Sequence, residues 1–243
     1  MKLDSTLNCQ LTLFGNYEQI APTTEILTFL MKEFNSTQMI PSVFQEPTAI
    51  GNTVPRVQLR SIDGTWVVNF GLARIDVRRE FGMGNFDDGQ FYQFLLTSNI
   101  FLNSVSEKFS IKHQRVGIVV NYLLPELGDL ETDAIYKKFS NPIDFYKEDV
   151  KTEWNFRVGK LSNVDLNGED YRANVITEVA KIVGKVNLTN RVEILNRILI
   201  GFDINTHQDS TEFKLGEEEI IRFVDFAEKT VIEVLSNILT LLK

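Results

Sequence analysis

The segment RVQLRSIDGTWVVNF, residues 56–70, constrains the fold of this chain more than any other. Two runs of alternating apolar and polar residues flank Asp63-Gly64, a dipeptide typical of two-residue β-hairpin turns. With that turn, Arg60 lies opposite Val67. One face of the hairpin is then apolar and the other polar. This pattern predicts an antiparallel sheet with one face on a core and one face exposed.

The alternation changes parity after this hairpin. Apolar positions are even-numbered through residue 72 but odd-numbered from Ile75 onwards. A bulge or a second tight turn is therefore expected at 71–73. Beyond it, Arg74, Asp76 and Arg78 project together from the polar face of the sheet.

The remaining periodicities predict further strands and helices. The nearly continuous apolar run at 113–124 predicts a central strand. Apolar residues at helical spacing predict the helices. The expected strands cover 7–15 and three runs after residue 150, and two of these runs are joined by a turn at Asn167-Gly168. The expected helices cover 22–35, about 88–110, 133–139 and 216–242.

The order of these elements predicts an α+β fold, with mostly antiparallel sheet and long helices packed on one face. It also suggests two similar halves. We expect an α+β half at 1–125, a loop-rich crossover with a short helix at 126–149, and a three-stranded antiparallel half with a long C-terminal helix at 150–243. The alternative is one continuous domain.

Composition narrows the classes of function. The chain has 25 basic and 33 acidic residues, a net charge of −8, which disfavours non-specific binding to nucleic acid or to anionic membranes. Cys9 is the single cysteine, so an intrachain disulfide or a cysteine-based zinc site is excluded. The N-terminal residues lack the pattern of a secretory signal. We therefore expect a soluble, cytoplasmic protein.

The glycine-rich loop in EFGMGNFDDGQFYQF, residues 80–94, is a partial match to a phosphate-binding loop. The third glycine of that motif is missing, and the loop's aspartates would repel a phosphate. We interpret it as a connector whose glycines turn the chain and in which Asp87 or Asp88 caps the next helix. No cofactor is predicted.

The residues suited to catalysis or metal binding are few. His113 and His207 are the two histidines, and no nucleophile motif surrounds a serine. His113 is expected at the surface. In FDINTHQD, residues 202–209, the alternating Asp203, His207 and Asp209 form a weak candidate for a metal site, but the segment departs from a calcium loop. A polar strand end is the preferred interpretation, and no metal is predicted.

The polar sheet face provides the candidate binding site. Its residues are Arg56, Arg60, Arg74, Asp76 and Arg78, with Arg79 and Glu80 beside them. Arginine side chains form forked contacts with carboxylates or phosphates, so this face could bind an acidic peptide, a protein partner or a nucleic-acid strand. The alternative is a solvated sheet face with cross-strand ion pairs.

The last predicted helix has a wide apolar stripe that begins at Ile220 and continues to Leu241. Its steps of four and three are also those of a coiled-coil seam. A core helix packed across the protein's own sheet is the preferred interpretation, and a homodimer through this helix is the alternative.

Three segments carry a family resemblance: PRVQLRSIDGTWVVNFG, QRVGIVVNYLLPE and ILIGFDINTH. In order and spacing they resemble an uncharacterised, sporadically distributed prokaryotic family of about this length. Asp203 matches an aspartate of that family, whereas Val119 and Val120 replace its arginine–aromatic pair. The family has no established activity, and its patchy distribution implies mobile or defence-associated genes.

Two hypotheses of function follow. The first is a non-enzymatic interaction or scaffold protein that binds a protein partner on the arginine-bearing sheet face. The second is a ligand-binding protein or a hydrolase-like enzyme with a polar pocket between the two halves, using Asp203, His207 and the arginines.

Overall fold

The computed structural model describes residues 1–34, 38–49, 51–84, 86–140, 151–188, 191–207, 212 and 214–243. Within these ranges the chain forms runs of strands separated by helices. The elements are β1 (Ser5–Phe14), α1 (Thr24–Glu33), β2 (Met39–Pro47), β3 (Thr53–Ser61), β4 (Trp66–Phe70), β5 (Arg74–Glu80), α2 (Gln90–Phe109), β6 (Arg115–Leu123), α3 (Asp129–Phe139), β7 (Trp154–Leu166), β8 (Glu169–Leu188), β9 (Arg191–Thr206) and α4 (Glu217–Leu241).

All the strands belong to one nine-stranded sheet in the order β2-β3-β4-β5-β1-β6-β9-β8-β7. Every neighbouring pair is antiparallel. The predicted α+β fold with an antiparallel sheet is thus confirmed, and so is a central strand within 113–124, because β6 lies beside the middle strand β1. The hairpin register also agrees with the sequence, since Arg60 pairs with Val67.

The parity change at 71–73 is a turn between two strands. Phe70 pairs with Ile75 and Val68 with Val77, so the apolar side chains of β4 and β5 point to the same face. The chain leaves the sheet between Phe70 and Arg74 and re-enters it in the opposite direction. This turn keeps one face apolar although the parity of the sequence has shifted by one.

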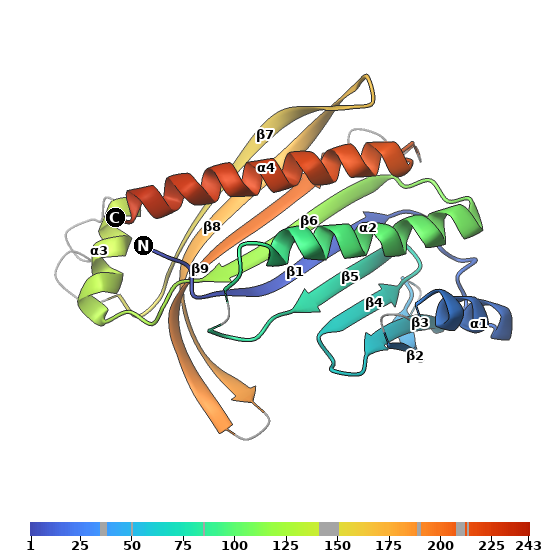
Figure 1. Cartoon of the computed structure of the whole chain (residues 1–243), viewed down its shortest axis with the longest axis horizontal. Coiled ribbons are helices and arrows are strands. Elements are labelled where there is room, and N and C mark those ends of the chain that lie inside the picture. Colours follow the sequence, from blue (N-terminus) through green and yellow to red (C-terminus); the bar gives the residue numbers. More distant parts are fainter. Residues whose placement is uncertain are drawn as a thin grey trace.

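The core lies between the sheet and the two longest helices, which lie on the same face of it (Figure 1). Alternate side chains of the central strands are fully buried there, including Leu11, Ile118 and Phe202. The terminal helix α4 contributes Phe223 and Val231 to the same cluster. The apolar stripe of α4 therefore packs largely against the protein's own sheet, as predicted for a core helix.

Strand β2 was not predicted, because Pro41 and Pro47 disfavour a strand within a sheet. It forms nonetheless because β2 is an edge strand, where one side of the backbone needs no hydrogen-bonding partner. The helix cap also differs from the prediction. Gly89 is the N-cap of α2, while Asp87 accepts a hydrogen bond from the Gly89 N–H at 2.8 Å.

None of the helices in the described ranges is long and apolar enough to span a membrane.

Candidate functional site

The sheet face that points away from α2 and α4 carries most of the charged and amide side chains of the strands, and we call it the open sheet face. Its members follow from the strand register and from the alternation with buried neighbours. They include Gln10, Thr12, Arg60, Asn69, Arg74, Asp76, Arg78, Arg115, Asn121, Asn174, Glu178, Asp203 and Asn205. Every arginine of the chain except Arg222 belongs to a strand. The arginines are therefore concentrated in the sheet, although the protein is acidic.

Asp76 organises the part of this face that the sequence singled out. One of its carboxylate oxygens accepts hydrogen bonds from the Thr12 hydroxyl at 2.8 Å and from the Gln10 amide at 3.0 Å. The other lies 2.9 Å from Nε of Arg74. Through these contacts Asp76 holds the neighbouring side chains in place. Because Asp76 is only 8% exposed, it leaves little carboxylate surface for a ligand.

Arg74 and Arg78 remain accessible beside Asp76. Their side chains are 60% and 48% exposed, and Arg78 pairs with Glu80 at 2.8 Å. Arg60, on β3, is exposed on the same face. Exposed ion pairs of this kind contribute under about 1 kcal/mol to stability, so these arginines can exchange partners at low energetic cost.

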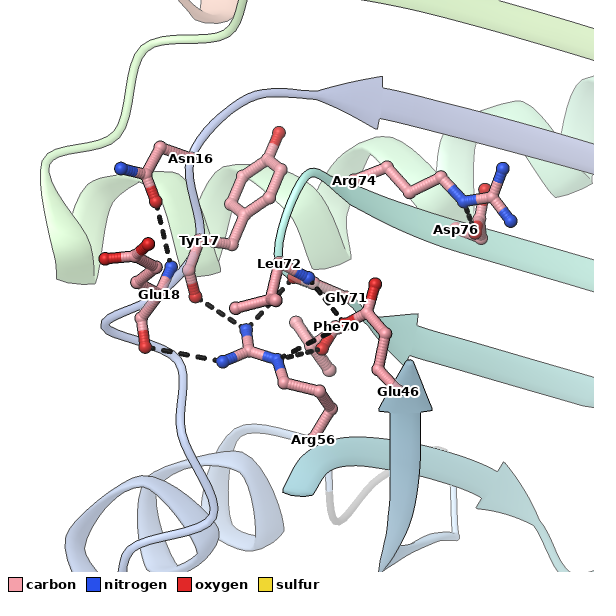
Figure 2. Close-up of polar contacts among 10 residues, drawn as sticks. All are labelled: Asn16, Tyr17, Glu18, Glu46, Arg56, Phe70, Gly71, Leu72, Arg74 and Asp76. Atoms are coloured by element: carbon pink, nitrogen blue, oxygen red, sulfur yellow. Dashed lines mark hydrogen bonds and ion pairs between the residues drawn. The ribbon is translucent and has the colours of Figure 1, made fainter. Parts of the chain in front are cut away.

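Arg56 lies apart from Arg74 and Asp76 although it has the same parity (Figure 2). Arg56 is only 2% exposed, and its guanidinium donates hydrogen bonds to backbone carbonyls at one end of the sheet. Nε donates to Phe70 O at 3.0 Å, Nη2 to Tyr17 O at 2.6 Å and Gly71 O at 3.0 Å, and Nη1 to Glu18 O at 3.4 Å. Arg56 therefore ties two loops to β3 and is not available to a partner.

The FDINTHQD segment is only partly described. Asp203 lies on the open sheet face and accepts a hydrogen bond from Asn205 at 2.9 Å. The His207 backbone N–H donates to Arg172 O at 2.7 Å, while Asp209 lies outside the described residues. Among the residues that are described, no three His, Cys, Asp or Glu side chains gather where they could hold a metal ion.

His113 is buried rather than at the surface, where the sequence placed it. It is 1% exposed, and its Nδ1 and Nε2 lie 2.7 Å from the Tyr17 hydroxyl and 2.9 Å from the Ser106 hydroxyl. Burial lowers the pKa of His113 to about 4. The end of α2, the loop after β1 and a backbone bridge to Leu215 together cover it, and the contacts with Tyr17 and Leu215 are distant in sequence.

A groove of about 700 Å³ lies between α2 and α4, over β1 and β6. Its walls are mainly apolar, and Phe91, Tyr122 and Leu235 are among them. The hydroxyl of Thr6, a residue 1% exposed, lines the groove without a hydrogen-bond partner among the described residues. Glu228 also lines it, and its pKa is raised by burial and by Asp225.

The residues proposed for a pocket between the halves do not line this groove. Asp203 and the arginines of the open sheet face point to the other side of the sheet. Thr6 and Glu228 could not be identified from the sequence, because the groove depends on how two helices distant in sequence pack. The sequence does contain a signal that Arg79 lies on the helix-covered face, because its odd number gives it the same parity as Ile75 and Val77.

Comparison with known proteins gave no match: no protein-family model, curated protein or solved structure is significantly similar to this chain.

Proposed function

We propose that the protein is a non-enzymatic interaction protein and that its open sheet face binds an acidic segment of a protein partner. The observation that supports this most is the pair of accessible arginines, Arg74 and Arg78, held in alternation with Asp76 and Glu80 on an uncovered strand face. Asp76 orders Arg74 without neutralising the whole guanidinium, so its remaining N–H groups can bind a carboxylate.

The alternating charges favour a protein over a nucleic-acid strand. On the open face of β5, Arg74 is followed by Asp76 and Arg78 by Glu80, and Glu178 and Asp203 add negative charge on β8 and β9. A phosphate backbone presents uniform negative charge and would be repelled at each of these positions. A protein segment can place acidic and polar side chains in alternation and match the pattern.

The strand order also supports an inference about how this face arises. We infer two related units, each with a strand, a helix, a run of antiparallel strands and a second helix. β1 to α2 would form the first unit and β6 to α4 the second, with β1 and β6 paired at the centre of the sheet. The open sheet face would then be continuous across both units.

Replacing Arg74 and Arg78 by Ala should weaken binding of an acidic peptide roughly tenfold, because two exposed charge contacts of about 0.5–1 kcal/mol each are lost. A suitable probe is a synthetic peptide in which Glu alternates with Thr, measured by fluorescence anisotropy at two salt concentrations. Thermal stability should change little, since both side chains are exposed.

Arg222→Ala is the matched control, because Arg222 is an exposed arginine on α4 and lies outside the sheet. It should leave binding of the peptide unchanged. Equal losses in the control and in the double variant would contradict the proposal. Tighter binding of a single-stranded oligonucleotide than of the peptide would assign the face to nucleic acid instead.

A second candidate function is binding of an apolar amine in the groove between α2 and α4. The buried Thr6 hydroxyl without a partner supports it, since such groups are usually hydrogen-bonded. The Asp88 and Glu228 carboxylates line the same groove and would attract a cationic group to its apolar walls.

Glu228→Gln should reduce the affinity for tryptamine by roughly tenfold, because it removes one charge-assisted hydrogen bond worth about 1.5 kcal/mol. Binding of neutral indole should not change. Calorimetric titration of both probes provides the measurement, with Glu233→Gln, an exposed position of α4, as the control. Equal affinity of the wild type for the two probes would exclude an amine site.

A further inference from the structure

Arg79 differs from its strand neighbours because it lies on the helix-covered face of the sheet. Its guanidinium carbon lies 5.0 Å from the centroid of the Trp66 ring and 4.6 Å from that of Phe81. Trp66 is itself stacked on Phe94, with 5.6 Å between ring centroids and an interplanar angle of 21°. The aromatic rings thus fix the position of the guanidinium and leave its N–H groups as the polar part of the site.

No carboxylate or carbonyl among the described residues accepts a hydrogen bond from this guanidinium. Its Nε atom is buried and has no hydrogen-bond partner. Asp63 influences it electrostatically, but the Asp63 carboxylate accepts hydrogen bonds from the Ser61 hydroxyl at 2.6 Å and the Thr65 N–H at 3.0 Å. Asp63 therefore holds the β3–β4 turn and is not paired with Arg79.

A cavity of about 440 Å³ opens beside Arg79. Trp66 and Phe101 contribute aromatic walls, and Met39 and Ile62 contribute aliphatic ones. The residues that line it also include Gln38, Ser61, Asp63 and Thr97. The cavity has the size and composition of a small-ligand site, which is usually apolar with a few fixed polar groups.

We propose that this cavity binds a small monocarboxylate with a flat apolar body, and that Arg79 pairs with its carboxylate. A partly buried guanidinium without an acceptor is unfavourable, and a bound carboxylate would supply the missing acceptor in a bidentate geometry. The aromatic and aliphatic walls would cover the body of the ligand. This binding site is independent of the open sheet face, because Arg79 and Arg78 point to opposite sides of β5.

The charges of the cavity decide between a carboxylate and a phosphate. Arg79 is the one cation among the residues that line it, and Asp63 places a carboxylate in the same wall. A dianionic phosphate would carry excess negative charge next to Asp63, whereas a monoanion balances Arg79 alone. A monocarboxylate is thus the better electrostatic match.

Benzoate is a direct probe of the proposal, with benzamide as its neutral analogue and phenyl phosphate as the dianion. Binding can be followed by the fluorescence of Trp66 in a Trp154→Phe background, which leaves Trp66 as the single tryptophan. Benzoate should bind saturably and at least about tenfold more tightly than benzamide, as expected when one charge-assisted pair is gained.

Arg79→Gln should reduce the affinity for benzoate to that for benzamide. The matched control is Arg222→Gln, because Arg222 is an exposed arginine on α4 that lies outside both proposed sites, and its affinity for benzoate should equal that of the wild type. If Arg79→Gln does not fold, Thr97→Glu tests the same point, because this half-buried position on α2 would place a negative charge in the cavity.

Three results would overturn the proposal. They are no saturable binding of benzoate, equal affinities for benzoate and benzamide, and an affinity for benzoate that Arg79→Gln, or Thr97→Glu in its place, leaves unchanged. Tighter binding of phenyl phosphate than of benzoate would overturn the assignment to a monocarboxylate.

Discussion

Arg56→Met should lower the free energy of unfolding by about 3–5 kcal/mol, the range typical when one partner is removed from a buried charged network. The variant keeps an unbranched apolar side chain but removes the guanidinium donor from four backbone carbonyls, those of Tyr17, Glu18, Phe70 and Gly71, of which Tyr17 O keeps a second donor in the Ile20 N–H. Carbonyls that lose their donor in a buried site retain the cost of desolvation. Urea denaturation measured by circular dichroism would give the change.

The chain provides a matched control in Arg60, which lies on the same strand with the same parity. Arg60 is exposed, so Arg60→Met should change the free energy of unfolding by no more than about 0.5 kcal/mol. Arg56→Lys should restore little of the loss, because one ammonium group cannot reach carbonyls that the forked guanidinium contacts from several directions. Equal effects of the Met variants at positions 56 and 60 would show that the carbonyl contacts do not stabilise the fold.

The contrast between Arg56 and Arg60 shows what sequence periodicity can and cannot predict. Alternation correctly predicted the register of the β3–β4 hairpin and the sheet face to which each side chain points. It could not predict that the loop containing Tyr17 and the turn after Phe70 would fold over one end of that face. Parity describes a strand, whereas burial also depends on segments distant in sequence.

The candidate sites also differ in whether one strand or the packing of several elements forms them. Arg74, Asp76 and Arg78 could be grouped from the sequence because all three lie on one strand and share its parity. The Arg79 cavity requires Phe101 from α2 and Met39 from β2, and the α2–α4 groove requires two helices far apart in the chain. Sites built from several elements depend on tertiary packing, which an alternation of residue types does not record.

Tyr17 connects the Arg56 contacts with the buried histidine. Its backbone carbonyl accepts a hydrogen bond from Arg56, and its hydroxyl is hydrogen-bonded to Nδ1 of His113. The loop after β1 is therefore fixed at two points, one of which contains a group that can titrate. Protonation of His113 would place a positive charge in a site that excludes water.

The stability of the wild-type protein should consequently fall as the pH is lowered from about 6.5 to about 4. His113 has a pKa of about 4 in the folded state, because it is buried, against an ordinary value of 6.5. Between these two values the unfolded chain binds a proton that the folded chain does not, so acid favours unfolding. A shift of this size corresponds to roughly 3 kcal/mol at most.

His113→Gln separates this contribution from those of the carboxylates, because the amide retains a donor and an acceptor but does not titrate. The variant should be less stable than the wild type at pH 7.5, and the difference between the two should narrow by roughly 2–3 kcal/mol at pH 4.5. His207→Gln leaves the Tyr17–His113–Ser106 cluster intact and should keep the wild-type pH dependence. A constant difference between the wild type and His113→Gln across this range would mean that His113 can be protonated in the folded protein.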